Sequence, residues 1–161
     1  MYCDFYDACP NRKRFSCDRQ EAHPGLPHCV RVSDEHHIQL ARRHALKRAE
    51  LLGMSSLDGY YVATAVSELA NNQFFHTENG GVIQFYRIEK DDRVGIEVVA
   101  QDDGPGIACI KAAMIDGYSS NCGLGGGLGG TERLMDEFEI ESEVGTGTRI
   151  VARKWVTTSQ H

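Results

Sequence analysis

The sequence contains no long hydrophobic run and no apolar segment near its start, and these absences narrow the classes of protein that it can encode. No stretch of about eighteen apolar residues occurs, so the sequence offers no membrane-spanning helix. The first ten residues, MYCDFYDACP, lack the apolar core of a secretory signal peptide. We therefore expect a cytoplasmic protein with no membrane partner.

Composition lies close to that of an average globular protein. Hydrophobic residues make up 41% of the chain and charged residues 25%, which argues against disorder and against a fibrous protein. A length of 161 residues suits one domain with a real core and is short for two.

Charge is distributed unevenly along the chain. Residues 1–49 hold nine Lys and Arg against six Asp and Glu, whereas the remainder holds eight against seventeen. The negative charge of this larger part opposes nucleic-acid binding, which depends on neutralising phosphates. We interpret the basic stretch Arg42, Arg43, Lys47 and Arg48 as a solvated helix face, with a docking surface for an acidic protein as the alternative.

Cysteines gather near the N-terminus, but none of them forms a C-x-x-C pair. With His23 and His28 nearby, a zinc site is the alternative to our preferred interpretation, which is an irregular, reduced extension over residues 1–28. A disulfide framework is not expected in the cytosol. The six cysteines are Cys3, Cys9, Cys17, Cys29, Cys109 and Cys122.

Residues 29–156 carry the periodic patterns of a folded domain, followed by a short tail at 157–161. Helices are expected early, with Ser33 and Ser55 as N-caps and Gly53 closing the first helix. Hairpins follow, which favours a two-layer α/β sandwich whose mixed, mostly antiparallel sheet is covered by helices on one face. The expected strands are 29–32, 82–88, 94–100, 138–143 and 148–155, and the expected helices are 34–52, 55–75, 107–116 and 131–136.

The stretch Gly123–Gly130 holds six glycines in eight positions. Such a loop can bring backbone N–H groups against phosphate oxygens, and the helix that follows adds the positive end of its dipole. A flexible linker is the alternative, although linkers rarely interleave residues such as Leu124 and Leu128. No Lys-Ser or Lys-Thr follows, so the loop is not a Walker A motif.

Two further motifs have polar side chains in an apolar setting. Asp102 begins D-D-G-P-G after a predicted strand, where a carboxylate can accept a hydrogen bond from a base amino group; an ordinary turn is the alternative. Glu68 and Asn72 share one face of a predicted helix with apolar flanks. A carboxylate there can deprotonate a hydroxyl and an amide oxygen suits Mg²⁺, whereas an exposed polar stripe is the alternative.

Four motifs follow one another in a fixed order: E-x-x-x-N, D-x-G-P-G, G-L-G-G-G-L and G-T-G-T before the last strand. This order resembles the GHKL (Bergerat-fold) ATP-binding superfamily, over about residues 30–155. The chain has no room for the second domain of a chaperone or topoisomerase. The segments S-E-L-A-N-N and D-G-Y-S-S are most similar to the anti-sigma-factor serine/threonine kinases, in particular the RsbT-type switch kinases of the stressosome.

The resemblance implies ATP and Mg²⁺ as cofactors and a role for each motif residue. Asp102 would bind the adenine amino group with help from Thr148, and Gly104 and Gly106 would line the adenine pocket. Glu68 would be the catalytic base and Asn72 would hold Mg²⁺. The lid over the phosphates would contain Gly123, Leu124, Gly125, Gly127, Leu128 and Gly129. Residues 1–28, Cys109 and Cys122 depart from the pattern of the group.

We therefore expect a kinase that phosphorylates a STAS-domain protein in a partner-switching pathway. A PP2C-type phosphatase or a sigma factor would be its second partner, and the oligomeric state stays open, with a homodimer as one option. The alternative is a non-catalytic, nucleotide-regulated module that sequesters a sigma factor or activates a phosphatase. A detached histidine-kinase ATPase domain is a third alternative.

Overall fold

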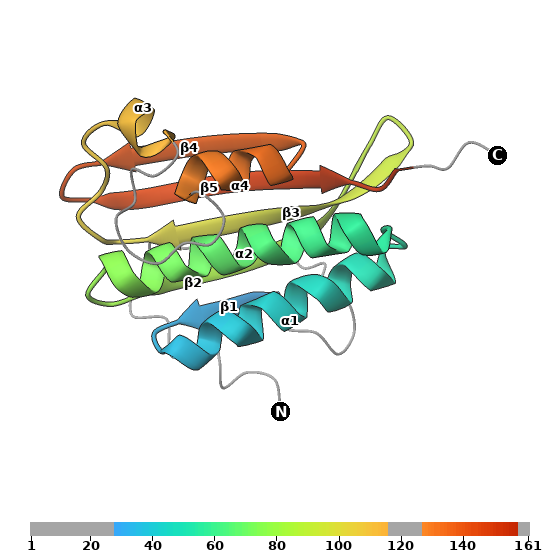
Figure 1. Cartoon of the computed structure of the whole chain (residues 1–161), viewed down its shortest axis with the longest axis horizontal. Helices are drawn as coiled ribbons and strands as arrows, with labels where there is room; N and C mark the ends of the chain where they lie inside the picture. Colours follow the sequence, from blue (N-terminus) through green and yellow to red (C-terminus); the bar gives the residue numbers. More distant parts are fainter. Residues whose placement is uncertain (1–27, 116–126, 158–161) are drawn as a thin grey trace.

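The computed structural model describes residues 28–115 and 127–157, in which one antiparallel sheet carries helices on a single face (Figure 1). The strand order is β1-β2-β3-β5-β4, and every pairing among these strands is antiparallel. The predicted two-layer α/β architecture is therefore confirmed. The strands are β1 (Cys29–Val32), β2 (Gly81–Lys90), β3 (Arg93–Asp102), β4 (Glu137–Glu143) and β5 (Gly147–Trp155).

Helix α1 (Glu35–Leu51) begins one residue later than the sequence predicted. The N-cap is Asp34 and not Ser33, because the Asp34 carboxylate accepts a hydrogen bond from the His36 backbone N–H at 3.2 Å. The His37 ring completes a reciprocal pair by accepting from the Asp34 backbone N–H at 3.1 Å. Gly53 follows the helix with a positive φ of 77°, which agrees with its predicted role in the cap.

Helix α2 (Ser56–His76) begins after Ser55, as predicted, since the Ser55 hydroxyl accepts from the Asp58 backbone N–H at 3.1 Å. It packs against α1 through small residues, so that a side chain on Gly59 would approach Ala49 Cβ to 3.4 Å. Both helices cover one face of the sheet. The helix-facing strand residues include Ile83, Phe85, Ile96, Val98, Ala100, Ile150 and Ala152.

The β2–β3 hairpin is longer than the sequence suggested and closes with a two-residue turn. Asp91 and Asp92 both adopt positive φ, at 52° and 61°. Successive positive φ values match the right-handed twist of the two strands, and aspartate tolerates them better than most residues.

The two remaining helices differ from the predicted ranges. Helix α3 is limited to Ile110–Ala113 within the described chain, whereas a helix over 107–116 was expected. Helix α4 (Gly127–Leu134) begins inside the glycine-rich stretch, four residues before the predicted start. Burial of Leu128 and Thr131 accounts for the earlier start, because tertiary packing offsets the cost of glycine in a helix.

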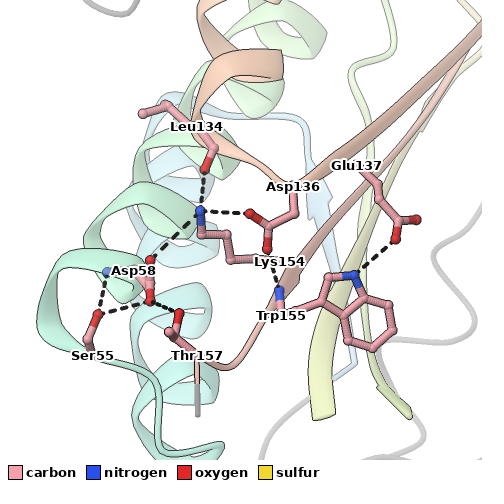
Figure 2. A network of polar contacts seen from close by, with 8 residues as sticks. All are labelled: Ser55, Asp58, Leu134, Asp136, Glu137, Lys154, Trp155 and Thr157. Atoms are coloured by element: carbon pink, nitrogen blue, oxygen red, sulfur yellow. Dashed lines mark hydrogen bonds and ion pairs between the residues drawn. The ribbon is translucent and has the colours of Figure 1, made fainter. Parts of the chain in front are cut away.

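A polar network joins α2, α4 and β5 at the end of the sheet where α2 begins (Figure 2). The Lys154 ammonium donates to the Leu134 carbonyl at 3.2 Å and lies 3.3 Å from the Asp136 carboxylate and 3.8 Å from that of Asp58. Asp136 also accepts the Trp155 backbone N–H at 2.8 Å. The network holds the start of α2 and the end of α4 on the same strand. None of the described helices has the length and apolar content needed to span a membrane.

Candidate functional site

A row of polar positions crosses the sheet at the end opposite to the Lys154 network. In register, Gly81 pairs with Asp102, Asp102 with Thr148, and Thr148 with Ser142. Side chains alternate between the faces of a strand, and Ala100 two residues before Asp102 faces the helices. The side chains of Asp102, Thr148 and Ser142 therefore lie on the helix-covered side of the sheet.

Asp102 occupies the central position of this row and is half-buried. Its Oδ1 atom accepts a hydrogen bond from the Gly104 backbone N–H at 3.0 Å, and the backbone N–H groups of Gly104 and Thr148 act to lower its pKa. Burial nevertheless raises the pKa of this carboxyl, and the neighbouring negative charge of Asp103 adds to the increase. The Asp102 carboxylate is thus a hydrogen-bond acceptor whose ionised form is disfavoured by burial.

Ser142 belongs to the row but was not predicted. Its Oγ lies 2.8 Å from Thr148 Oγ1 and accepts the Ile107 backbone N–H at 2.8 Å. These contacts tie the D-D-G-P-G loop, which leads to Ile107, to the last hairpin. The place of Ser142 in the row becomes apparent only from the pairing of β4 with β5. Its position opposite Thr148 depends on the strand register, which cannot be predicted from the sequence.

The turns at this end of the sheet require glycine at two positions. Gly106 has φ +75°, and a Cβ atom there would lie 2.2 Å from the Glu143 carbonyl oxygen. Gly147 has φ +135°, and its Cβ would lie 2.1 Å from the Asp102 carbonyl oxygen. The close approach keeps the loop after β3 against the β4–β5 hairpin. Gly104 packs against Thr77 at the end of α2, since a Cβ on it would meet Thr77 Cγ2 at 2.6 Å.

Glu68 and Asn72 lie one turn apart on α2, as predicted. Glu68 is buried, with 5% of its surface exposed, and Asn72 is half-buried. Their burial rules out the exposed polar stripe. The same helix reaches the row at its C-terminal end, because Gln73 Nε2 donates to the carbonyl of Gln101, the residue before Asp102, at 3.1 Å.

The glycine-rich stretch is described only from Gly127 onward. Gly127, Leu128 and Gly129 form the buried first turn of α4, which packs against α2. The first N–H groups of a helix have no partner within it and are suited to bind an anion, so the phosphate lid stays a prediction for this part of the stretch. Cys122, Gly123, Leu124 and Gly125 lie outside the described residues, as do residues 1–27 with the zinc-site alternative.

A cleft of about 470 Å³ opens at the same end of the sheet, and Asp102, Ser142 and Thr148 of the polar row contribute to its lining. Gln101, Arg149 and Glu141, which pair across the strands, contribute to its lining, and no residue of α2 does. The cleft therefore includes Asp102 but neither Glu68 nor Asn72, which lie on α2. The candidate site is defined by the polar row and α2.

Known proteins with similar sequences identify the family. Serine/threonine-protein kinase RsbT of Bacillus subtilis (strain 168) is 41% identical over 128 residues, which cover 80% of this chain and 96% of RsbT. This chain belongs to the RsbT family of serine/threonine-protein kinases. Its membership confirms the predicted family and enzyme class, and a kinase of this family uses a nucleotide.

Other comparisons give weaker matches. The anti-sigma F factor of Clostridium novyi (strain NT) is 42% identical over 101 residues, covering 58% of this chain and 68% of that protein. The anti-sigma F factor of Clostridium acetobutylicum is 39% identical over 98 residues, with coverages of 58% and 67%. The mycobacterial sensor histidine kinase MprB aligns with a TM-score of 0.46 and 16% identity over 74% of this chain and 94% of that chain. No protein-family model matches the sequence.

Proposed function

We propose that this RsbT-family kinase transfers the γ-phosphoryl group of ATP to a serine or threonine hydroxyl of a STAS-domain protein in a partner-switching pathway. One observation carries the proposal: α2 bears the buried Glu68 and half-buried Asn72, and its C-terminal end is bonded to the strand that ends in Asp102. A base-binding acceptor and two phosphotransfer groups thus belong to one rigid unit.

Asp102 is the proposed partner of the adenine amino group. Its carboxylate lies in the polar row beside Thr148, and Gly104 and Gly106 allow the chain to turn next to a ring. A charged acceptor in a half-buried setting forms a stronger hydrogen bond than one in water. A bound donor would offset the desolvation that raises the pKa of Asp102, because it would form a hydrogen bond to the ionised carboxylate.

Asn72 is the proposed protein ligand of Mg²⁺. The ion would neutralise charge on the phosphates, and it usually keeps several waters and takes few protein ligands. A single amide oxygen on the half-buried Asn72 fits that pattern. The N-terminus of α4, with Gly127, Leu128 and Gly129, is the proposed site for phosphate oxygens, and Gly123, Leu124 and Gly125 complete the proposed lid.

Glu68 is the proposed base toward the substrate hydroxyl. The hydroxyl oxygen bonds to the γ-phosphorus, the bond from that phosphorus to the bridging oxygen of ADP breaks, and the hydroxyl proton passes to the Glu68 carboxylate. Phosphoryl transfer demands mainly positioning and charge stabilisation from the protein, which a rigid helix supplies.

A second function is favoured by the names of two relatives. Because both are anti-sigma F factors, the chain is also a candidate to bind a sigma factor, or a PP2C-type phosphatase, through a surface that does not require transfer. This binding role and the kinase role are compatible, and the nucleotide would then set the shape of the binding surface.

The test is incubation of the purified kinase with labelled ATP, Mg²⁺ and candidate STAS-domain proteins. We expect label on the STAS protein that survives acid, as phosphoserine and phosphothreonine do. Acid-labile label would indicate transfer to histidine and contradict the proposal. Stable binding of ATP and of the partner without any transfer would favour the binding module.

A further inference from the structure

Gln73 lies on α2 directly after Asn72 and is almost completely buried, with 2% of its surface exposed. Its Nε2 atom donates to two backbone carbonyls, those of Val82 on β2 and Gln101 on β3, each at 3.1 Å. Its Oε1 atom is buried and has no hydrogen-bond partner in the part of the chain that the structure describes. A buried acceptor without a donor is uncommon in native proteins and calls for an explanation.

The orientation of the Gln73 amide follows from its surroundings. Exchanging the oxygen and nitrogen would place Oε1 against two carbonyl oxygens and would lose both hydrogen bonds. The amide nitrogen therefore faces the strands. The oxygen is left as an acceptor for a donor that arrives from elsewhere.

Gly81 leaves room for the Gln73 amide beside the backbone position that pairs with Asp102. A Cβ atom on Gly81 would lie 2.4 Å from Gln73 Cδ and 2.6 Å from Nε2, so the amide occupies the space that a side chain at position 81 would fill. Gly81 and Asp102 are paired across β2 and β3, which puts their Cα atoms about 4.5–5.5 Å apart. Gln73 thus extends the polar row by one position beyond Asp102.

We propose that Gln73 is a base-specificity residue, whose Oε1 accepts a hydrogen bond from an ordered water that is held by the 6-amino group of the purine. The proposal rests on the assignment of Asp102 to adenine made under Proposed function. A 6-amino group has two N–H donors, and it can serve Asp102 directly and Gln73 through the water. A 6-oxo purine has a carbonyl oxygen at this position. That oxygen would face the acceptor oxygens of Asp102 and Gln73 without a donor between them, so such a purine is rejected.

The test compares two ligands, Mg²⁺–ATP and the Mg²⁺ complex of purine riboside triphosphate, which lacks the 6-amino group. Gln73→Met keeps the length of the side chain but removes the acceptor. We expect the ATP affinity to fall about five- to tenfold, the weight of one neutral hydrogen bond, and the affinity for the analogue to change less than about twofold. Isothermal calorimetry measures both.

A purely structural role for Gln73 gives a different result. Loss of the two bonds from Nε2 would loosen α2 from the strands and weaken both ligands equally, and an equal loss, or no loss of either, overturns the proposal. Gln84→Met is the matched control. Gln84 is a buried glutamine on β2, one of the two strands that Gln73 contacts, and its side chain lies on the face of the sheet away from the helices. It is expected to leave the ratio of the two affinities unchanged.

Two further variants keep the outcome decisive. If Gln73→Met fails to fold in a thermal melt, Gln73→Asn retains an amide but withdraws it by one methylene, and the same selective loss of ATP is expected. Asp102→Asn separates this proposal from the one on which it rests. If Asp102→Asn leaves the ATP affinity unchanged, the adenine site is refuted. If Asp102→Asn weakens ATP binding but Gln73→Met weakens both ligands equally, only the role of Gln73 is refuted.

Discussion

The two ends of the sheet differ in how their polar groups are paired. At the end where α2 begins, Lys154, Asp136 and Asp58 pair with one another and with backbone groups of α4 and β5 (Figure 2). At the end where α2 finishes, burial raises the pKa of Asp102, and the Oε1 atom of Gln73 has no partner among the described residues. Among the described residues, the charged groups at the first end pair with one another, whereas Gln73 Oε1 at the second end has no partner.

This difference suggests a division of roles: residues at the Lys154 end stabilise the fold, and residues at the Asp102 end are the candidates for binding and transfer. Native proteins tolerate unsatisfied polar groups and strained turns mainly where a ligand or a reaction uses them. The Lys154 end fixes α2 and α4 on the sheet, and the Asp102 end presents the groups that a nucleotide would satisfy. Substitutions at the first end should therefore change folding, whereas those at the second should change binding and transfer.

The largest expected effect belongs to Glu68. Glu68→Ala should reduce phosphoryl transfer to the STAS protein about 10²- to 10⁴-fold, the usual contribution of a positioned acid–base group, while much of the ATP affinity remains. Labelled transfer and calorimetry on the same preparations give the two values. Asn72→Ala is the contrasting variant, since it should lose Mg²⁺-dependent nucleotide binding together with transfer. Transfer by Glu68→Ala at the wild-type rate would remove Glu68 from the mechanism.

Asp102→Asn should weaken ATP binding about ten- to a hundredfold, because a hydrogen bond to a charged group contributes roughly 1.5–3 kcal/mol. The same change should not reduce stability at pH 7. The folded-state pKa of Asp102 is raised, so the wild type loses stability as the pH rises through the range just above the ordinary carboxyl value, and asparagine avoids that loss.

Denaturant unfolding at pH 7 and in mild acid checks the stability of the Asp102 variant. Its stability relative to wild type should be equal or higher at pH 7, and any advantage should shrink as the pH falls through the folded-state pKa. A clear loss of stability at pH 7 would mean that Asp102 is mainly a structural residue.

Lys154→Met should act at the other end of the sheet. It leaves the carboxylates of Asp58 and Asp136 without their cation and should lower the free energy of unfolding by about 2–3 kcal/mol, less than the loss of a fully buried pair because Asp136 is partly exposed. ATP affinity, measured where the variant is still folded, should stay within about threefold of wild type. A larger loss of affinity would show that the two ends are coupled.

The smallest effect is expected for Lys47→Ala. Lys47 and Glu50 form an ion pair of 3.1 Å on the exposed side of α1, where water screens the attraction. The change in the free energy of unfolding should lie within about 0.5 kcal/mol, and ATP binding should not change. Chemical denaturation measures this change. A loss of stability well above about 0.5 kcal/mol would mean that the basic face of α1 contributes to the stability of the fold.

Much of the fold could be read from local patterns. Ser55 as an N-cap, Gly53 after α1 and the five strands follow from capping chemistry and alternation, which act within a few residues. The misplaced boundaries have physical reasons. Asp34 displaced Ser33 because the capping pair with His37 depends on side-chain geometry, and α4 began at Gly127 because packing against α2 outweighed the low helix propensity of glycine.

The candidate site was predicted only in part. Glu68, Asn72 and Asp102 stand in motifs whose spacing and resemblance to a family single them out, and their roles remain predictions. Ser142 and Gln73 carry no such signal. Ser142 meets Thr148 only through the pairing of β4 with β5. The Gln73 amide lies beside position 81, which pairs with Asp102, only because that position is a glycine.

The sequence by itself determined the family, the helices and strands, and the residues able to take part in chemistry. These depend on residue type and on spacing along one helix or strand. Tertiary structure decided which of those residues share a site and which polar groups are left unsatisfied. Register and packing bring together positions as far apart in the chain as Gln73 and Gln101, or Asp102 and Thr148. Burial raises the pKa of Asp102 and, within the part of the chain that the structure describes, leaves Gln73 Oε1 without a donor. This burial exists only once those segments have come together.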